Sequence, residues 1–343
     1  MADTNSLNVN DVNDADNIHD DHHPTLPWLP TEDEVIRMAI IEKELDSTRL
    51  MTESKWGFRM DSPSRSAPPI WVKYKYNPVL LRCEANTQRY VHQELAKADE
   101  ETKARFRVPE VYHFFEAEFD GTEYGLILME YLPGLSVREL LFPFLSREVA
   151  SSDERIPLYK GKAVDAICFI LSLRAPPDAA PGPVGGGLIW HRAFGVDDPY
   201  PEFVFESLED LQDYINEARE QDEPDSPPAD FLSEGLRLCC GDLGLQNFIL
   251  EDASNPLSSR VIIIDFEYTN WLPHSFQVWE SWRYGDVHLS EGIRLKGPCP
   301  INEDNVMAID VMHRRRARIE REARNRYLNR HHTHDPYNDA AEC

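Results

Sequence analysis

Two neighbouring stretches of the chain decide the fold: residues 239–250, CCGDLGLQNFIL, and residues 261–267, VIIIDFE. In the first, Asp242 precedes Asn247 by five positions on a tight loop; the second is a short apolar strand that ends in Asp265. Phosphoryl transfer from a nucleotide needs ligands for metal ions and a carboxylate that orients the attacking hydroxyl. Because Mg²⁺ prefers hard oxygen ligands, such as an Asn amide and an Asp carboxylate, the pattern predicts that these three side chains converge on one phosphate-handling site.

The same residues resemble the catalytic loop and the metal-binding segment of the aminoglycoside phosphotransferase and choline kinase family, especially its fungal members. Protein kinases share the layout more distantly. The resemblance covers residues 55 to 282, and four upstream segments follow in the order of that family. They are Val72-Lys73-Tyr74, the helix that begins with Glu84-Ala85-Asn86, Val108-Pro109-Glu110-Val111-Tyr112, and Ile127-Leu128-Met129-Glu130-Tyr131-Leu132-Pro133-Gly134.

The resemblance implies a role for each matching side chain. Asp242 would orient the substrate hydroxyl and accept its proton, and Asn247 and Asp265 would bind Mg²⁺. Lys73 would contact the phosphates of ATP, with Glu84 as its ion-pair partner. The adenine would lie against the segment between the lobes, at Met129 and at the backbone groups of Glu130 and Leu132. The implied enzyme is an ATP-dependent phosphotransferase that acts on a hydroxyl of a small molecule.

The resemblance also implies the fold class, which is α+β with two protein kinase-like lobes. A small β-rich lobe, residues 30–130, would bind the nucleotide. A large, mostly helical lobe, residues 131–330, would carry the catalytic and substrate-binding groups. Residues 1–29 form an acidic tail whose composition predicts disorder, and residues 331–343 are expected to form a flexible tail.

Local patterns predict the elements of both lobes. Apolar spacing and capping residues predict helices over residues 31–44, 84–95, 137–145, 157–173, 207–220 and 306–327. Short apolar runs predict strands over residues 55–60, 70–76, 111–117, 125–131, 248–250 and 261–264.

Two positions depart from the family pattern. Cys240 stands where the family usually has a His before Gly-Asp, and the segment 54–69 contains Gly57 as its only glycine, so no glycine-rich loop is present to close over phosphates. A catalytically silent pseudokinase, acting as a binding or scaffold protein of the same fold, is therefore the alternative function. A nucleophilic Cys240 with His191 or His274 as its base is a further chemistry, but no spacing supports it.

The charge of the chain bears on its partners. The 343 residues carry a net charge of −26, and the first 34 contribute nine acids and no Lys or Arg. An acidic body argues against nucleic-acid binding, because phosphates need Lys and Arg to displace their counterions. It is compatible with a cationic small-molecule substrate, and ten acids between Glu206 and Asp230 form a candidate surface for one, although a solvated helix face is the simpler interpretation.

Other features concern the compartment. No apolar run reaches the roughly 18 residues of a membrane span, and the polar N-terminus predicts no signal peptide. Six scattered cysteines fit free thiols in a reducing compartment, so we expect a cytoplasmic protein without a membrane partner. Eight arginines between Arg314 and Arg330 leave nuclear import or a protein partner as alternatives to an exposed helix that offsets the acidic body.

Overall fold

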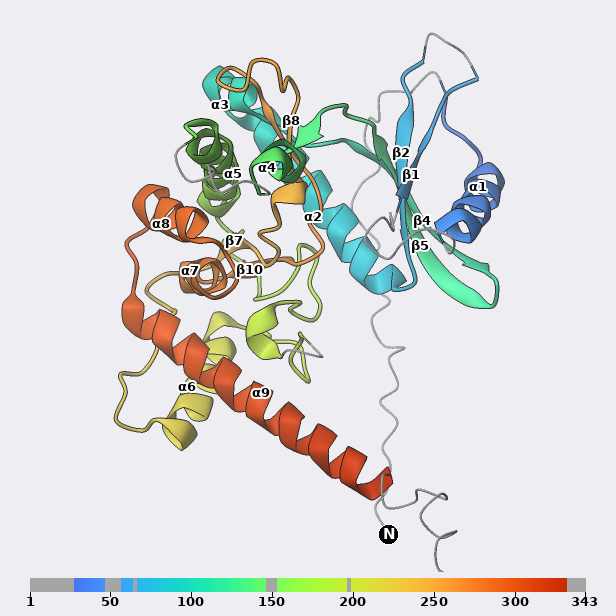
Figure 1. The fold of residues 1–343 in the computed structure, drawn as a ribbon. Coiled ribbons are helices and arrows are strands. Elements are labelled where there is room, and N and C mark those ends of the chain that lie inside the picture. Colours follow the sequence, from blue (N-terminus) through green and yellow to red (C-terminus); the bar gives the residue numbers. More distant parts are fainter. Residues whose placement is uncertain (1–27, 47–56, 64–66, 146–152, 196–198, 332–343) are drawn as a thin grey trace, which may run out of the picture.

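The computed structural model describes residues 28–46, 57–63, 67–145, 153–195 and 199–331. They form two lobes, one built on an antiparallel sheet and one mostly helical (Figure 1). The predicted two-lobed α+β fold, with a small β-rich lobe and a large, mostly helical one, is confirmed. Apart from residues 28, 29 and 331, the predicted tails lie outside the described residues. None of the helices in the described ranges combines the length and the apolar character that crossing a membrane requires.

The small lobe contains a four-stranded antiparallel sheet in the order β1-β2-β5-β4. Its strands are β1 (Gly57–Met60), β2 (Ile70–Lys75), β4 (Val111–Phe119) and β5 (Thr122–Glu130). Helix α1 (Glu32–Asp46) packs on one face and α2 (Pro78–Lys97) on the other (Figure 1). Because β5 is covered on both faces, it reads as a continuous apolar run from Tyr124 to Met129 rather than as an alternating one.

Helix α2 begins six residues before the predicted start at Glu84. Asn77 caps it by accepting a hydrogen bond from the Leu80 amide at 3.0 Å, and Pro78 occupies the first turn, where no amide donor is needed. The longer helix reaches both lobes. Leu81 and Ala85 belong to a core cluster of the small-lobe sheet. Val91 and Leu95, about two to four turns later, belong to the core of the large lobe.

The large lobe contains six longer helices and two small sheets in its described part. The helices are α4 (Val137–Leu145), α5 (Arg155–Ser172), α6 (Leu208–Asp222), α7 (His274–Arg283), α8 (Val287–Lys296) and α9 (Glu303–His331). One sheet pairs β7 (Arg237–Cys240) with β10 (Thr269–Leu272). The other has the order β3-β9-β8-β6 and consists of β3 (Phe106–Arg107), β9 (Val261–Ile263), β8 (Phe248–Leu250) and β6 (Leu135–Ser136).

Strand β3 was not predicted. A short helix, α3 (Glu100–Arg105), follows α2, and then Phe106 and Arg107 pair in parallel with Val261 and Ile262 of β9. The chain that connects α2 to β4 therefore passes through a sheet of the large lobe. Helices α7 and α8 and strand β10 also have no counterpart in the sequence prediction.

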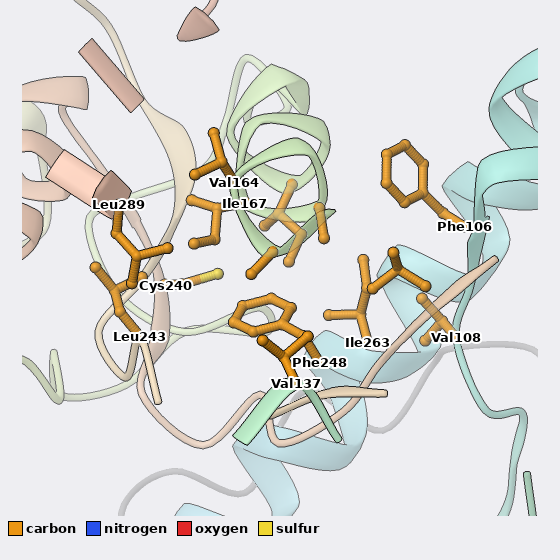
Figure 2. Close-up of a cluster of buried hydrophobic side chains, with 14 of the residues drawn as sticks. Phe106, Val108, Val137, Val164, Ile167, Cys240, Leu243, Phe248, Ile263 and Leu289 are labelled. Carbon is orange, nitrogen blue, oxygen red and sulfur yellow. The ribbon is translucent and has the colours of Figure 1, made fainter. Parts of the chain in front are cut away.

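A hydrophobic cluster around α5 supports the loop that carries Asp242 (Figure 2). Val164 and Ile167 of α5 belong to it, together with Phe248 at the start of β8 and Leu243 within the loop. Leu243 and Phe248 are 6% and 2% exposed. The loop that carries Asp242 is therefore anchored in the core inside and just after its turn.

Ion pairs join α6 to α9, and we call this set the α6–α9 seam. Asp222 at the end of α6 pairs with Arg315 at 2.8 Å and with Arg318 at 2.9 Å, and Glu223 pairs with Arg314 at 2.9 Å. Arginines of the last helix are thus paired with part of the acidic segment 206–230. This pairing agrees with a helix that offsets the acidic body.

Candidate active site

Lys73 forms two ion pairs, one within the small lobe and one that joins it to the large lobe. Its ammonium nitrogen Nζ lies 2.6 Å from Glu84 Oε1 and 2.9 Å from Asp265 Oδ1. Lys73 belongs to β2, Glu84 to α2, and Asp265 follows β9, so three distant parts of the chain meet here. Lys73 is opposite Ile127 on β5, and Ile127 packs with α2 side chains. Because directly opposed residues share a sheet face, this register turns Lys73 toward α2.

Burial and charge together set the proton affinities of this cluster. Burial disfavours the Lys73 cation, but the carboxylates of Asp265 and Glu84 outweigh it and raise the pKa of Lys73. Burial raises the pKa of Glu84 to about 7, against the opposing effect of the Lys73 ammonium. Burial would also raise the pKa of Asp265, but the Lys73 ammonium lowers it below its usual value. Lys73 is therefore a cation and Asp265 an anion at neutral pH.

The backbone at Asp265 has the left-handed conformation, with φ of 65°. Non-glycine residues rarely adopt it, and such strain persists where the surrounding structure enforces it, often at functional sites. The preceding Ile264 amide donates a hydrogen bond of 3.0 Å to the Asn247 carbonyl, and Phe248 pairs with Ile263 across β8 and β9. These bonds place Asn247 beside the turn at Asp265.

The loop between β7 and β8 holds the Asp242 carboxylate at both oxygens. The Gly244 amide donates to Asp242 Oδ1 at 3.0 Å, and Asn247 Nδ2 donates to Asp242 Oδ2 at 3.2 Å. Asn247 is 3% exposed, and its Oδ1 accepts no hydrogen bond within the described residues. The amide nitrogen of Asn247 therefore orients Asp242, while its oxygen is available to a cation.

The segments that carry Asp242 and Asp265 lie side by side at Tyr268, whose carbonyl accepts a hydrogen bond of 2.8 Å from the Gly241 amide. Burial raises the pKa of the Tyr268 hydroxyl to about 12, and the charges of Glu267, Asp242 and Asp265 add to the effect. The structure thus brings together the five residues to which the sequence assigned phosphate and metal chemistry: Lys73, Glu84, Asp242, Asn247 and Asp265.

Three carboxylates offer oxygen atoms within 4.8 Å of one another: Glu84, Asp265 and Glu267. Glu84 is paired with Lys73, and Glu267 is paired with Lys75. The Asp265 side chain is 32% exposed and keeps a solvent-facing part. Together with Asn247 Oδ1, this donor set fits a hard divalent cation such as Mg²⁺. The sequence analysis assigned no role to Glu267, although it lies only two positions after Asp265.

The side-chain amide of Gln277, on α7, supports the loop at Cys240. Its Oε1 accepts a hydrogen bond from the Cys240 amide at 2.8 Å, and its Nε2 donates to the Cys240 carbonyl at 3.2 Å. The Cys240 thiol itself faces the core, and burial raises its pKa to about 12. A thiol that stays protonated is a poor nucleophile, so the structure does not support the cysteine chemistry.

Arg192 and Glu280 lie next to Asp242 and were missed by the sequence analysis. Arg192 contacts Glu280 Oε1 at 3.1 Å and Asp242 Oδ1 at 3.7 Å, and its guanidinium lies over the ring of Tyr284 at 5.0 Å. Glu280 is fully buried, and burial raises its pKa to about 8 although Arg192 opposes the shift. The only local signal was a polar pair, His191 and Arg192, after a glycine-rich segment.

The segment expected to border the adenine lies at the end of β5. Met129 is buried, and its sulfur accepts a hydrogen bond of 3.5 Å from Gln88 Nε2. The Glu130 amide is already bonded to the Glu110 carbonyl at 2.8 Å. The Leu132 amide makes no backbone hydrogen bond within the described residues, so it is available to a ligand edge.

No family model and no curated protein matches the chain. Similar solved structures include an aminoglycoside phosphotransferase from Alicyclobacillus acidocaldarius, 12% identical, with 83% of this chain and 82% of that chain covered and a TM-score of 0.40. A macrolide 2′-phosphotransferase from Brachybacterium faecium is 10% identical, with 77% and 81% covered and a TM-score of 0.35. An amicoumacin kinase, in complex with AMP-PNP and Ca²⁺, is 11% identical, with 82% and 87% covered and a TM-score of 0.38.

Proposed function

We propose that this chain is an ATP-dependent phosphotransferase that phosphorylates a hydroxyl group of a small molecule. The observation that carries the proposal is the convergence at one site of a lysine held by two carboxylates and an Asp–Asn loop. Lys73 Nζ is fixed by Glu84 and Asp265, and Asp242 is fixed by Asn247 and Gly244. Phosphoryl transfer depends mainly on such positioning and on charge stabilisation.

The site supplies separate groups for the nucleotide and for the metal. Lys73 would contact the phosphates of ATP from the small lobe, and Leu132 would offer its amide to the adenine. Asp265 and Asn247 would hold Mg²⁺, with Glu267 near enough to contribute. When bound, Mg²⁺ neutralises charge on the phosphates and orients them.

Asp242 is the residue in position to accept a proton. In the proposed reaction the substrate oxygen forms a bond to the γ-phosphorus, and the bond from that phosphorus to the bridging oxygen breaks, so ADP leaves. The hydroxyl proton passes to Asp242. Two hydrogen bonds fix the carboxylate, which lets it orient the hydroxyl before the transfer.

The charge of the acceptor is constrained by the neighbours of Asp242. The acidic segment 206–230 was compatible with a cationic substrate, but Asp222 and Glu223 of that segment are paired with arginines of α9. Beside Asp242 lies Arg192, a cation. A cationic acceptor therefore has less support than the composition suggested.

Two measurements test the proposal. In calorimetric titration, ATP with Mg²⁺ should bind the wild type and Asp242→Asn, whereas Asp265→Asn should lose at least about tenfold in affinity; Asp61→Asn, a change at an exposed carboxylate, is the control. In an ADP-release assay across hydroxyl-bearing small molecules, Asp242→Asn should lower turnover by about 10²-fold or more. Absence of nucleotide binding at millimolar ATP would sink the proposal. Binding without turnover would favour the silent pseudokinase.

A further inference from the structure

A cavity lies in the large lobe, and the candidate active-site residues do not line it. Its volume is about 590 Å³, and residues from three loops or strand ends line it, among them Arg174, Glu234, Arg237, Cys299 and Asn302. Arg237 begins β7, the strand whose other end leads to Asp242. Arg237 and Asp242 are five positions apart, which is at most about 17 Å of extended chain. None of the residues that line the cavity belongs to the candidate active site.

Arg237 is a buried cation without a counterion. The residue is 6% exposed. Its Nε has no hydrogen-bond partner, and its Nη1 donates one long hydrogen bond of 3.4 Å to the Leu171 carbonyl. Within the described residues it forms no ion pair. Buried charges are normally paired, because removing an ion from water without compensation costs several kcal/mol.

The one carboxylate that lines the cavity is already used. Glu234 accepts hydrogen bonds from the Ser275 amide at 3.0 Å, from the Ser275 hydroxyl, and from Asn305 Nδ2 at 2.7 Å. It lies farther than ion-pair distance from Arg237. Its role is to tie the loop before β7 to α7 and α9, and it leaves the guanidinium uncompensated.

A second arginine faces the same cavity. Arg174 is exposed and forms no ion pair within the described residues, and its backbone bridges that of Arg237. In a chain with a net charge of −26, two unpaired arginines on one cavity are a local reversal of the overall charge. His274, packed near Arg237, also has a buried unpartnered Nε2, and burial and the Arg237 charge lower its pKa to about 4.

We infer that this cavity binds a small organic oxyanion, a carboxylate or a phosphate ester, with Arg237 as the buried anchor and Arg174 at the rim. Guanidinium groups bind such planar or branched oxyanions through paired donors. The volume exceeds what a bare ion fills and suits a metabolite-sized ligand. Ala175, Leu236, Pro300 and Ile301 supply an apolar wall for its carbon skeleton.

The test uses the whole chain carrying Lys73→Met, so that anions do not report on the nucleotide site. Citrate, glycerol 3-phosphate and inorganic phosphate are titrated at constant ionic strength, with chloride as the reference. At saturation at least one organic anion should raise Tm by about 2 °C or more. Citrate alone would assign a carboxylate site, and glycerol 3-phosphate alone a phosphate-ester site. A response to inorganic phosphate alone, or to none of the three at 10 mM, overturns the inference.

Variants separate the ligand site from a structural role. Arg237→Met should abolish the anion response and leave the anion-free Tm unchanged or higher, because it removes an uncompensated charge. Arg174→Gln should weaken anion affinity about fivefold or more, and Arg82→Gln, an exposed arginine of α2, should not change it. If Arg237→Met does not fold, Arg174→Gln decides. An anion response that survives both variants contradicts the assignment.

Discussion

Two networks of ion pairs, the cluster around Lys73 and the α6–α9 seam, differ in how deeply they are buried. In the cluster around Lys73, the side chains of Lys73 and Glu84 are 12% and 1% exposed. In the α6–α9 seam, the side chains of Arg314 and Arg318 are 48% and 54% exposed. Exposed pairs contribute about 0.2–1 kcal/mol, whereas removing one partner of a buried pair costs about 3–5 kcal/mol.

The comparison separates ion pairs that need no functional explanation, those of the seam, from ion pairs that do, those of the Lys73 cluster. The seam offsets the acidic surface at little cost. The Lys73 cluster is expensive to bury, and apolar residues of similar size would stabilise the fold as well or better. Its retention is explained by the phosphate chemistry proposed for the site.

The largest effect is expected for Lys73→Met. The change leaves Glu84 without its cation, so the free energy of unfolding should fall by about 3–5 kcal/mol at pH 8, and ATP affinity by at least about tenfold. The loss of stability should be smaller at pH 5, where Glu84 takes up a proton. Urea unfolding and calorimetric titration measure both. Lys97→Met, a change at an exposed lysine of α2, is the control, and equal losses in the two variants would contradict the contrast.

The second prediction concerns the pH dependence of stability through Glu280. Its folded pKa of about 8 lies above the ordinary glutamate value, so the folded chain holds a proton that the unfolded chain releases. The resulting stability is complete below about pH 4.5 and is lost as the pH rises toward 8. Glu280→Gln cannot titrate, and we expect it to reduce this decline by on the order of 3 kcal/mol.

Urea unfolding at several pH values between 4.5 and 8 tests the Glu280 prediction. Glu118→Gln, a change at an exposed position of β4, should leave the wild-type decline intact. Parallel pH curves for wild type and Glu280→Gln would show that Glu280 is ionised in the folded protein throughout this range.

A smaller effect is expected for Gln277→Ala. It leaves the buried amide and carbonyl of Cys240 without partners, which should cost about 2 kcal/mol. Hydrogen exchange of the peptide 239–247 should become faster. Gln246→Ala, an exposed change in the same loop, should leave exchange unchanged. Unaltered exchange in Gln277→Ala would remove Gln277 from its supporting role.

The smallest effect is expected in the α6–α9 seam. Arg318→Gln should lower the free energy of unfolding by less than about 1 kcal/mol, and about 1 M salt should abolish the difference because the Debye length is then about 3 Å. Thermal unfolding at low and high salt measures it. A loss above about 2 kcal/mol that persists in salt would erase the distinction between the two networks.

The parts of the site that follow one another in a short stretch were predictable. Asp242 and Asn247 lie on one loop, and Asp265 ends the next strand, so local geometry brings them together. Lys73 and Glu84 were predictable only from their order along the chain. The structure places Lys73 in contact with Glu84 and with Asp265, while their roles in phosphoryl transfer stay predictions.

Arg192, Gln277 and Glu280 were not predictable, because nothing local distinguishes them from surface residues. Each acts through a partner at least 35 positions away, and only the packing of α7 against β7 reveals it. Strand β3 was not predictable either, because two residues are too few to show a periodicity. The early start of α2 was different: Asn77 and Pro78 were a visible capping signal.

Helix α2 belongs to both lobes, because its first half packs in the core of one and its second half in the core of the other. Its first turns hold Leu81, Ala85 and Glu84 against the small-lobe sheet, and its later turns hold Val91 and Leu95 in the other core. Between these halves the Thr87 hydroxyl donates to the Cys83 carbonyl at 2.8 Å, a bond that bends helices. A hinge motion between the lobes would therefore bend or twist the helix near Thr87, whereas sliding one lobe past the other would break apolar contacts at both ends of the helix.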